Sequence, residues 1–236
     1  MTATRFIPRE LHRGYTMVRR SLATLSFVLA VATPLAAQMK DHDPDMKAKG
    51  GGLPAGWMGR TDKADGKIKD AKFVTMGTGF HVTSGPAAIY WMEKTKTKGP
   101  FTATATLTQT KAPTHPEAYG IFFTGSELNS PKQTYGYLLV RGDGKVMVKH
   151  RAGAETHTIL DWTENAAVKK ADAAGKATNT VTVDATMADS VRLKVNGVQV
   201  AALPGAHVGS TDGHVGLRVN HNLDVHVSEF TVTPKK

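Results

Sequence analysis

Apolar and polar residues alternate along most of the chain after Leu53, in short runs that glycine, proline, asparagine and aspartate interrupt. A period of two is the pattern of a β-strand with one buried face. Residues 101–108 alternate without error, so that Phe101 and Leu107 are expected to face inward and four threonines outward. Many short strands of this kind, separated by turns, predict an antiparallel β-sandwich.

Two hairpins stand out in this pattern. Residues 191–195 alternate and are followed by Asn196-Gly197, the dipeptide favoured in two-residue hairpin turns, before the chain returns in residues 198–200. The second hairpin is centred on residues 142–144. A three-residue loop there pairs Val140 with Val146 and Leu138 with Val148 in the core, whereas a two-residue loop would mix apolar and polar residues on each face.

Eight further segments have strand-like composition. They are residues 72–76, 79–83, 87–91, 118–124, 155–162, 179–184, 214–220 and 224–233. Residues 165–177 lack large apolar side chains and contain a glycine, so we expect a loop or a short helical turn there. About a dozen strands without internal repeats predict two packed sheets.

The N-terminal part has the composition of an export signal. Arg19 and Arg20 precede an apolar run of about 11 residues, which ends in small residues before Gln38 and is shorter than the ~20 residues of a membrane-spanning helix. We therefore expect cleavage near Ala37, a secreted or periplasmic protein, and no stable membrane span afterwards. Residues 1–37 are then an N-terminal extension and signal peptide, 38–52 a flexible leader, and 53–236 a single β-sandwich domain.

Charge and cysteine content narrow the function further. The formal net charge is +10, and removing the five arginines and one glutamate of residues 1–37 leaves +6. Because the lysines are spread along the chain rather than clustered, we expect no nucleic-acid partner. The absence of cysteine excludes disulfides and thiolate chemistry.

Four segments carry a family resemblance. Residues 120–123, 137–144, 191–197 and 212–219 occur in this order in concanavalin A-like domains. The chain resembles the concanavalin A-like lectin/glucanase superfamily over about residues 73–233, and is most similar to exported bacterial domains of the 3-keto-disaccharide hydrolase type. The resemblance implies an all-β antiparallel jelly roll, a fold that serves both binding proteins and enzymes.

Catalytic patterns are weak in this sequence. Glucanases need two carboxylates close together, but the glutamates here are isolated and no run of alternating acids occurs. The secondary candidates for an acid or base are two small groups, near residue 117 and near residue 161. They comprise His115, Glu117, Tyr119, Asp161 and Trp162. Catalytic residues thus remain unknown, and a solvated loop is the alternative for each group.

Metal sites are not expected either. His214, His221 and His226 lack the spacing of two ligands on one element, so zinc is disfavoured. Asp62, Asp65 and Asp70 would supply oxygen ligands for calcium, but neighbouring lysines oppose this. We therefore expect no cofactor, with calcium as the alternative.

One sheet face offers a binding surface. The three-residue loop places Tyr135, Tyr137 and Arg141 on the same side as Lys149 and Arg151, opposite the core. Aromatic rings stack on the apolar faces of sugars and basic groups donate to hydroxyls. The alternative is that loops cover this face and the tyrosines are ordinary core residues.

Three functions remain open on these observations. The first is an exported carbohydrate-binding or surface-interaction module without catalytic machinery, whose partner is a carbohydrate or an envelope component. The second is a hydrolase acting on glycosides, which the family resemblance implies. The third is a structural subunit of an envelope assembly.

Overall fold

The computed structural model describes residues 45–49 and 52–235. The chain divides into two units, residues 1–40 and 41–236, and every described residue belongs to the second. The expected extension and signal peptide, and most of the expected leader, therefore lie outside the described residues and stay predictions. Across the described residues, no helix combines the length and apolar character needed to cross a bilayer.

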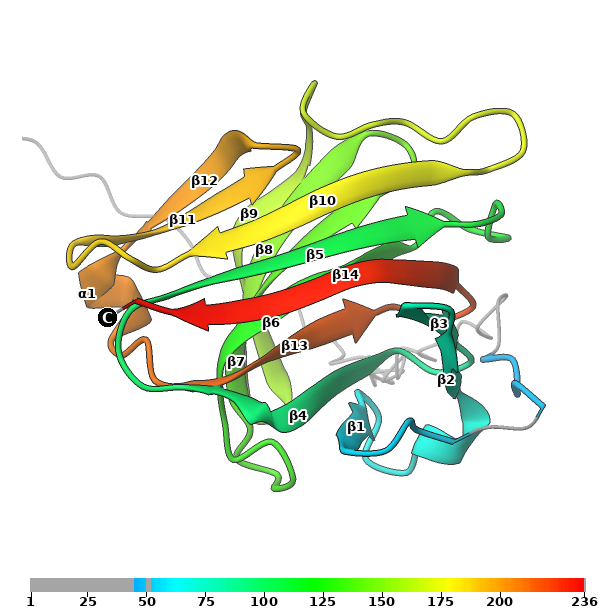
Figure 1. Ribbon diagram of the computed structural model, residues 1–236, viewed down its shortest axis with the longest axis horizontal. Helices are drawn as coiled ribbons and strands as arrows, with labels where there is room; N and C mark the ends of the chain where they lie inside the picture. Colours follow the sequence, from blue (N-terminus) through cyan, green and yellow to red (C-terminus); the bar gives the residue numbers. More distant parts are fainter. Residues whose placement is uncertain (1–44, 50–51, 236) are drawn as a thin grey trace, which may run out of the picture. The chain divides into compact units, whose positions relative to one another are not determined.

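Two seven-stranded antiparallel sheets form the fold, as Figure 1 shows. The first sheet has the order β1 (Trp57–Thr61), β4 (Ala88–Thr97), β13 (Gly213–Val219), β6 (Ala118–Ser126), β7 (Thr134–Arg141), β8 (Lys145–Ala152) and β9 (Glu155–Glu164). The second has the order β12 (Val198–Pro204), β11 (Ser190–Val195), β10 (Ala177–Asp184), β5 (Phe101–Gln109), β14 (Asp224–Pro234), β3 (Gly79–Thr83) and β2 (Lys72–Met76). The predicted antiparallel β-sandwich is confirmed.

The strand predictions hold with a few extensions. β4 and β12 run further than expected, and β1 was not predicted because Trp57–Thr61 contains a glycine and no clear alternation. Residues 165–176 form the predicted loop. Two short helices were also missed, η1 (Ile68–Asp70) and α1 (Gly205–Val208), each too short for a periodic signal.

The core lies between the sheets and follows the predicted alternation. Phe101, Ala103, Ala105 and Leu107 of β5 are fully buried. Leu138, Val140, Val146 and Val148 join the same cluster from the first sheet. Because side chains alternate along each strand, the other half of β7 and β8 must face away from the second sheet.

Both predicted hairpins have the expected register. Val140 lies opposite Val146 and Leu138 opposite Val148, which confirms the three-residue loop. At the other turn, Asn196 and Gly197 have φ of 49° and 83°, as a type I′ turn requires. The side chain of Asn196 also accepts a hydrogen bond from Thr180 N at 2.9 Å through Oδ1 and donates one to Ala167 O at 2.7 Å through Nδ2. The turn is therefore bonded to two neighbouring segments.

Residues 45–49 make contacts where the sequence predicts a flexible leader. The Met46 amide donates to Asn222 Oδ1 at 2.8 Å, and the Ala48 amide donates to Asp70 O at 2.9 Å. These five residues are therefore bonded to the sandwich, and we call them the strap. The remainder of the predicted leader up to residue 44 is outside the described residues.

Gly197→Val should destabilise the protein by about 1–3 kcal/mol, because a β-branched residue resists the positive φ of the turn. The midpoint of urea unfolding measures this, with Val198→Thr on the adjacent exposed position as the matched control. An unchanged midpoint for Gly197→Val would show that the turn relaxes at no cost.

Candidate functional site

The outer face of the first sheet, which points away from the second sheet, carries the predicted tyrosines. Tyr135 and Tyr137 of β7 lie there with Leu139 and Met147, so the predicted common face is confirmed. However, the two tyrosines are only 1% and 3% exposed. The expectation that these rings are open to a sugar is therefore wrong. The rings belong to a second apolar cluster, which agrees with the alternative that the tyrosines are core residues.

The side chains of two arginines cover these rings, whereas the alternative prediction was that loops would cover them. The Arg218 guanidinium of β13 lies 4.6 Å from the centre of the Tyr137 ring, and Arg151 lies 6.0 Å from the Tyr135 ring. Arg218 Nη1 also donates to the Tyr135 hydroxyl at 3.3 Å. Cation–π contacts of this kind suit buried arginines because the ring face replaces part of the lost hydration.

Asp62 neutralises this group from the edge of the sheet. Arg218 holds its carboxylate through two hydrogen bonds of 2.8 and 2.6 Å, and Arg151 Nη2 lies 3.4 Å from Oδ2. Burial by itself would raise the pKa of Asp62, but the charge and hydrogen bonds of Arg218, followed by Arg151, outweigh it, and the pKa is lowered. The pKa values of Tyr135 and Tyr137 are raised, mainly by burial, so both hydroxyls stay protonated.

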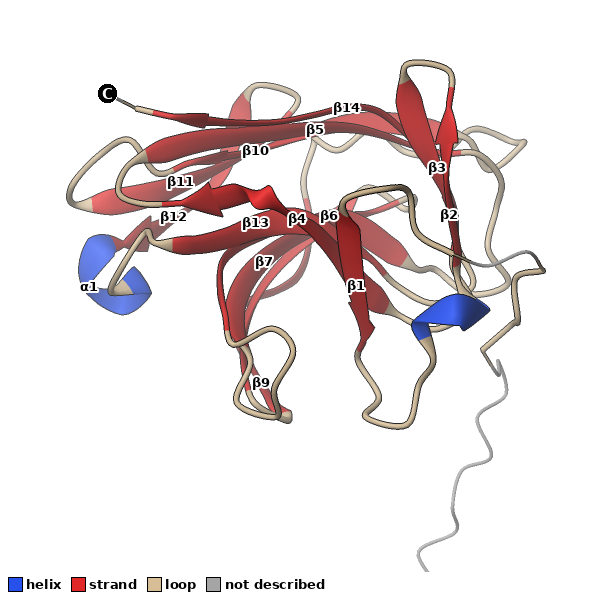
Figure 2. Cartoon of the chain, turned by 60° about the horizontal axis from the view of Figure 1, so that its bottom comes forward, coloured by secondary structure: helices blue, strands red, loops and turns tan. Residues whose placement is uncertain are grey.

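The position of Asp62 shows how strongly the first sheet curls. Asp62 follows β1, and four strands separate β1 from β8, which carries Arg151. In a flat sheet these strands would lie roughly 24 Å apart, at a spacing of about 4.8 Å, which is beyond the combined reach of the two side chains. Figure 2 shows the edge strands β1 and β9 bending to the same side, away from the second sheet.

A pocket of about 360 Å³ lies beyond this cluster, where the loops after β5, β7 and β9 meet. We call it the loop-end pocket. It is lined by Gln109, Ala112, Pro113, Thr114, Pro116, Glu117, Gly142, Asp143, Ala171, Asp172, Ala173 and Gly175. Its walls are mainly alanine and proline, with a few polar groups, which is the usual make-up of a small-ligand site.

Gln109 supplies the most unusual polar group of this pocket. Its side chain is almost fully buried and donates from Nε2 to Gly175 O at 2.7 Å. Its Oε1 is buried and accepts no hydrogen bond from the described residues. A Cβ added to Gly142 would lie 3.0 Å from that oxygen, so glycine at 142 leaves room beside it. A buried acceptor without a donor is unfavourable and is a good place for a ligand hydroxyl.

Asp143 lines the loop-end pocket and is bonded to Arg141. Arg141 donates to Asp143 at 2.9 and 2.6 Å, and its guanidinium stacks 4.4 Å from the centre of the Trp162 ring. This bidentate pair lowers the pKa of Asp143. None of the predicted binding residues lines this pocket, but Arg141 is linked to it through Asp143, and Trp162 through Arg141.

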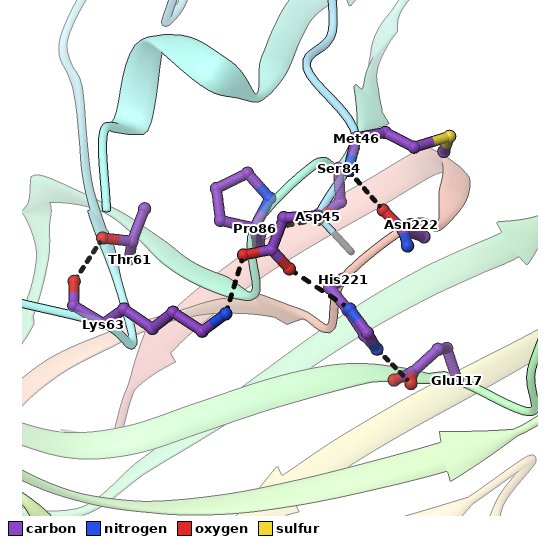
Figure 3. A network of polar contacts seen from close by, with 9 residues as sticks. All are labelled: Asp45, Met46, Thr61, Lys63, Ser84, Pro86, Glu117, His221 and Asn222. Atoms are coloured by element: carbon purple, nitrogen blue, oxygen red, sulfur yellow. Dashed lines mark hydrogen bonds and ion pairs between the residues drawn. The ribbon is translucent and has the colours of Figure 1, made fainter. Parts of the chain in front are cut away.

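Glu117 borders the pocket and belongs to a polar network that Figure 3 shows. His221 Nε2 lies 2.6 Å from Glu117 Oε1, and His221 Nδ1 lies 3.2 Å from Asp45 Oδ1. Asp45 in turn forms an ion pair with Lys63 at 3.2 Å. One histidine thus links the pocket to the strap.

The other secondary candidates do not converge with Glu117. His115 is exposed on the loop, and Tyr119 is buried between the sheets, where Asn179 donates to its hydroxyl at 3.3 Å. Asp161 is exposed and accepts from the Trp162 amide at 2.8 Å. The five secondary candidates therefore do not form a catalytic cluster.

The acidic residues considered for calcium also point apart. Asp62 is held by arginines, while Asp65 and Asp70 line a different hollow together with lysines. His214 lies 3.2 Å from Glu93, and the ring of His226 packs near that of His81. Among residues 45–49 and 52–235, no three histidine or acidic side chains are grouped to hold a metal ion.

The comparison with known proteins shows the class of fold. No protein-family model matches the chain, and no curated protein matches it. Among solved structures, a Bacteroides ovatus mixed linkage glucan GH16 in complex with a G4G4G3G product is similar at a TM-score of 0.50 and 9% identity, over 75% of this chain and 94% of that one. The fold is thus the concanavalin A-like jelly roll.

More distant similarities include two lectin structures. The Emp47p carbohydrate recognition domain has a TM-score of 0.47 at 10% identity, covering 82% of this chain and 94% of that one. Sheep galectin-11 in complex with glycerol has a TM-score of 0.42 at 7% identity, covering 67% and 99%.

Asp62→Asn should destabilise the protein by about 3 kcal/mol at pH 7, because it leaves buried Arg218 without its counter-charge. Since the folded protein lowers the pKa of Asp62, its stabilisation is present above the unfolded pKa and is lost as pH falls through the folded value. Urea unfolding at pH 7 and pH 3 should therefore show the difference between wild type and variant shrinking in acid. A constant difference would contradict this, and exposed Asp161→Asn serves as the control.

Proposed function

We propose that this protein is a carbohydrate-binding β-sandwich and that the loop-end pocket is its binding site. The observation that carries the proposal is the loop-end pocket, whose lining includes Gln109 with its unpaired Oε1. Asp143 and Glu117 add carboxylate oxygens to the same pocket. These three groups accept hydrogen bonds, so they favour a ligand that presents several donors on a small frame.

A sugar meets this requirement better than other common ligands. Its hydroxyls donate to the carboxylates and to Gln109, and its C–H face packs on walls such as Pro113 and Pro116. Arg141 donates to Asp143 and lies over the Trp162 ring, so these two residues would extend the contact to a second sugar ring. The similar GH16 structure contains a glucan product, which agrees with a sugar as the ligand class.

Binding is favoured over hydrolysis by the state of the carboxylates. Cleavage of a glycosidic bond needs one protonated carboxyl group as the acid. The pKa of Asp143 is lowered by Arg141, and Glu117 accepts a short hydrogen bond from His221. Asp143 therefore favours the ionised form, which accepts from sugar hydroxyls and does not donate a proton, and Glu117 is already bonded to a histidine.

Hydrolysis of the 3-keto-disaccharide type is the second candidate. Glu117 favours it, because a carboxylate held by a histidine and open to a pocket is suited to act as a base. In that case, Glu117 would act as the base that takes a proton from water. The leaving part of the bound sugar would then depart without help from a strong acid.

Gln109→Leu should weaken the binding of a glycan at least tenfold, because it replaces the buried acceptor with an apolar group of similar size. A glycan array on wild type identifies the ligand, and calorimetry compares the two proteins. Thr231→Ser, on the outer face of the second sheet, is the control and should bind like wild type.

Equal affinity of Gln109→Leu and wild type would place the site elsewhere, and no binding to any glycan would refute the proposal. Release of reducing sugar from the bound glycan, with loss of release in Glu117→Gln, would favour the second candidate.

We also propose export, with cleavage after Ala37 and a secreted or periplasmic location. The basic residues, the short apolar run and the small residues before Gln38 support it. Mass spectrometry of protein recovered from a bacterial host that secretes it should give a chain beginning at Gln38. A chain that retains Met17 to Ala37 would instead indicate a tethered form.

A further inference from the structure

The strap, residues 45–49, is held by a few polar contacts at one end of the sandwich. Two are main-chain bonds, from Met46 to Asn222 and from Ala48 to Asp70. Asp45 contacts His221 and also pairs with Lys63, and Figure 3 shows both contacts beside the chain turn at Ser84 to Pro86. Little apolar surface of the strap is buried, because the Met46 side chain is exposed. The polar contacts therefore decide whether it stays in place.

His221 can satisfy both of its carboxylate partners only when it is charged. A neutral imidazole has one N–H donor and one acceptor nitrogen, and an ionised carboxylate only accepts. Here both nitrogens face carboxylate oxygens, Nε2 at 2.6 Å from Glu117 and Nδ1 at 3.2 Å from Asp45. Hydrogen bonds to both carboxylates therefore require a proton on each ring nitrogen.

We propose that His221 is a pH-dependent latch, which holds the strap when it is protonated and releases it when it loses a proton. This goes beyond sugar binding and is tested without a sugar. After deprotonation, the single remaining N–H stays with Glu117, because that contact is the shorter one. The lone pair of Nδ1 then faces the Asp45 carboxylate, so this contact becomes repulsive, and the strap is left with its two main-chain bonds and the ion pair of Asp45 with Lys63.

The charged groups around His221 come from three segments. Glu117 precedes β6, Asp45 belongs to the strap, and Asp62 and Lys63 follow β1. Lys63 also pairs with Asp45, but its side chain is 61% exposed, so solvent screens this pair, and Asp62 is held by Arg218.

Release of the strap would open space beside the proposed binding site. A hollow of about 220 Å³ is lined by Asp45, Asp62, Lys63, Pro86, Ala87 and His221. His221 separates this hollow from the loop-end pocket, which Glu117 borders on the other side of their hydrogen bond. Removing Asp45 leaves the hollow without one wall.

A spin label on the strap tests the latch directly. The chain contains no cysteine, so Lys47→Cys gives a single attachment site on an exposed strap position. Between pH 5 and pH 8 the ratio of mobile to immobile label should rise about tenfold, as expected for the loss of one hydrogen bond between charged groups. The same label with His221→Gln should be mobile at both pH values.

Gly85→Ala provides an independent release of the strap. A Cβ at Gly85 would overlap the carbonyl oxygen of Met46, so this variant should show a mobile label even at pH 5. Circular dichroism checks that both variants are folded. A wild-type label with equal mobility at pH 5 and pH 8 would overturn the proposal, and so would a pH response that persists in His221→Gln.

Discussion

The contact of Arg218 with Asp62 holds the first sheet in its curled shape. It joins β13 to the chain just after the edge strand β1, and Arg151 extends it to β8. These strands can meet only because the sheet curls, and the arginines in turn fill the hollow that curling creates. A buried pair of this kind adds little net stability against an apolar replacement, but it costs much when broken. Its role here is to define one arrangement of the outer face.

Because tyrosine and arginine side chains fill the outer face of the first sheet, the proposed binding site lies at the edge of that face. Tyr135 and Tyr137 supply packing beneath the arginines, and the groups that stay open lie on the loops that follow β5, β7 and β9. There, Gln109 offers a buried acceptor, and Gly142 leaves the space beside it. The hydrogen-bonded strands on either side hold these loops in position, as a rigid scaffold commonly does for the loops of a binding site.

The fold was largely predictable from local patterns, and the site was not. Alternation in residues 101–108 and the dipeptide Asn196-Gly197 report on neighbours in sequence, and the buried face of the first and the turn at the second were confirmed. Nothing near Asp62 in sequence indicates Arg218, because their contact depends on the curl of a sheet assembled from distant strands. In the sequence, Gln109 likewise appears only as the last residue of a strand. The loops that follow β5, β7 and β9 make it a lining residue of the pocket.

The most direct test of this account is a crystal structure of the protein with its tightest-binding oligosaccharide. The account predicts sugar density in the loop-end pocket, with a hydroxyl within hydrogen-bonding distance of Gln109 Oε1 and the bond between Arg218 and Asp62 intact. Sugar stacked on Tyr137 at the outer face, with Arg218 displaced, would contradict it.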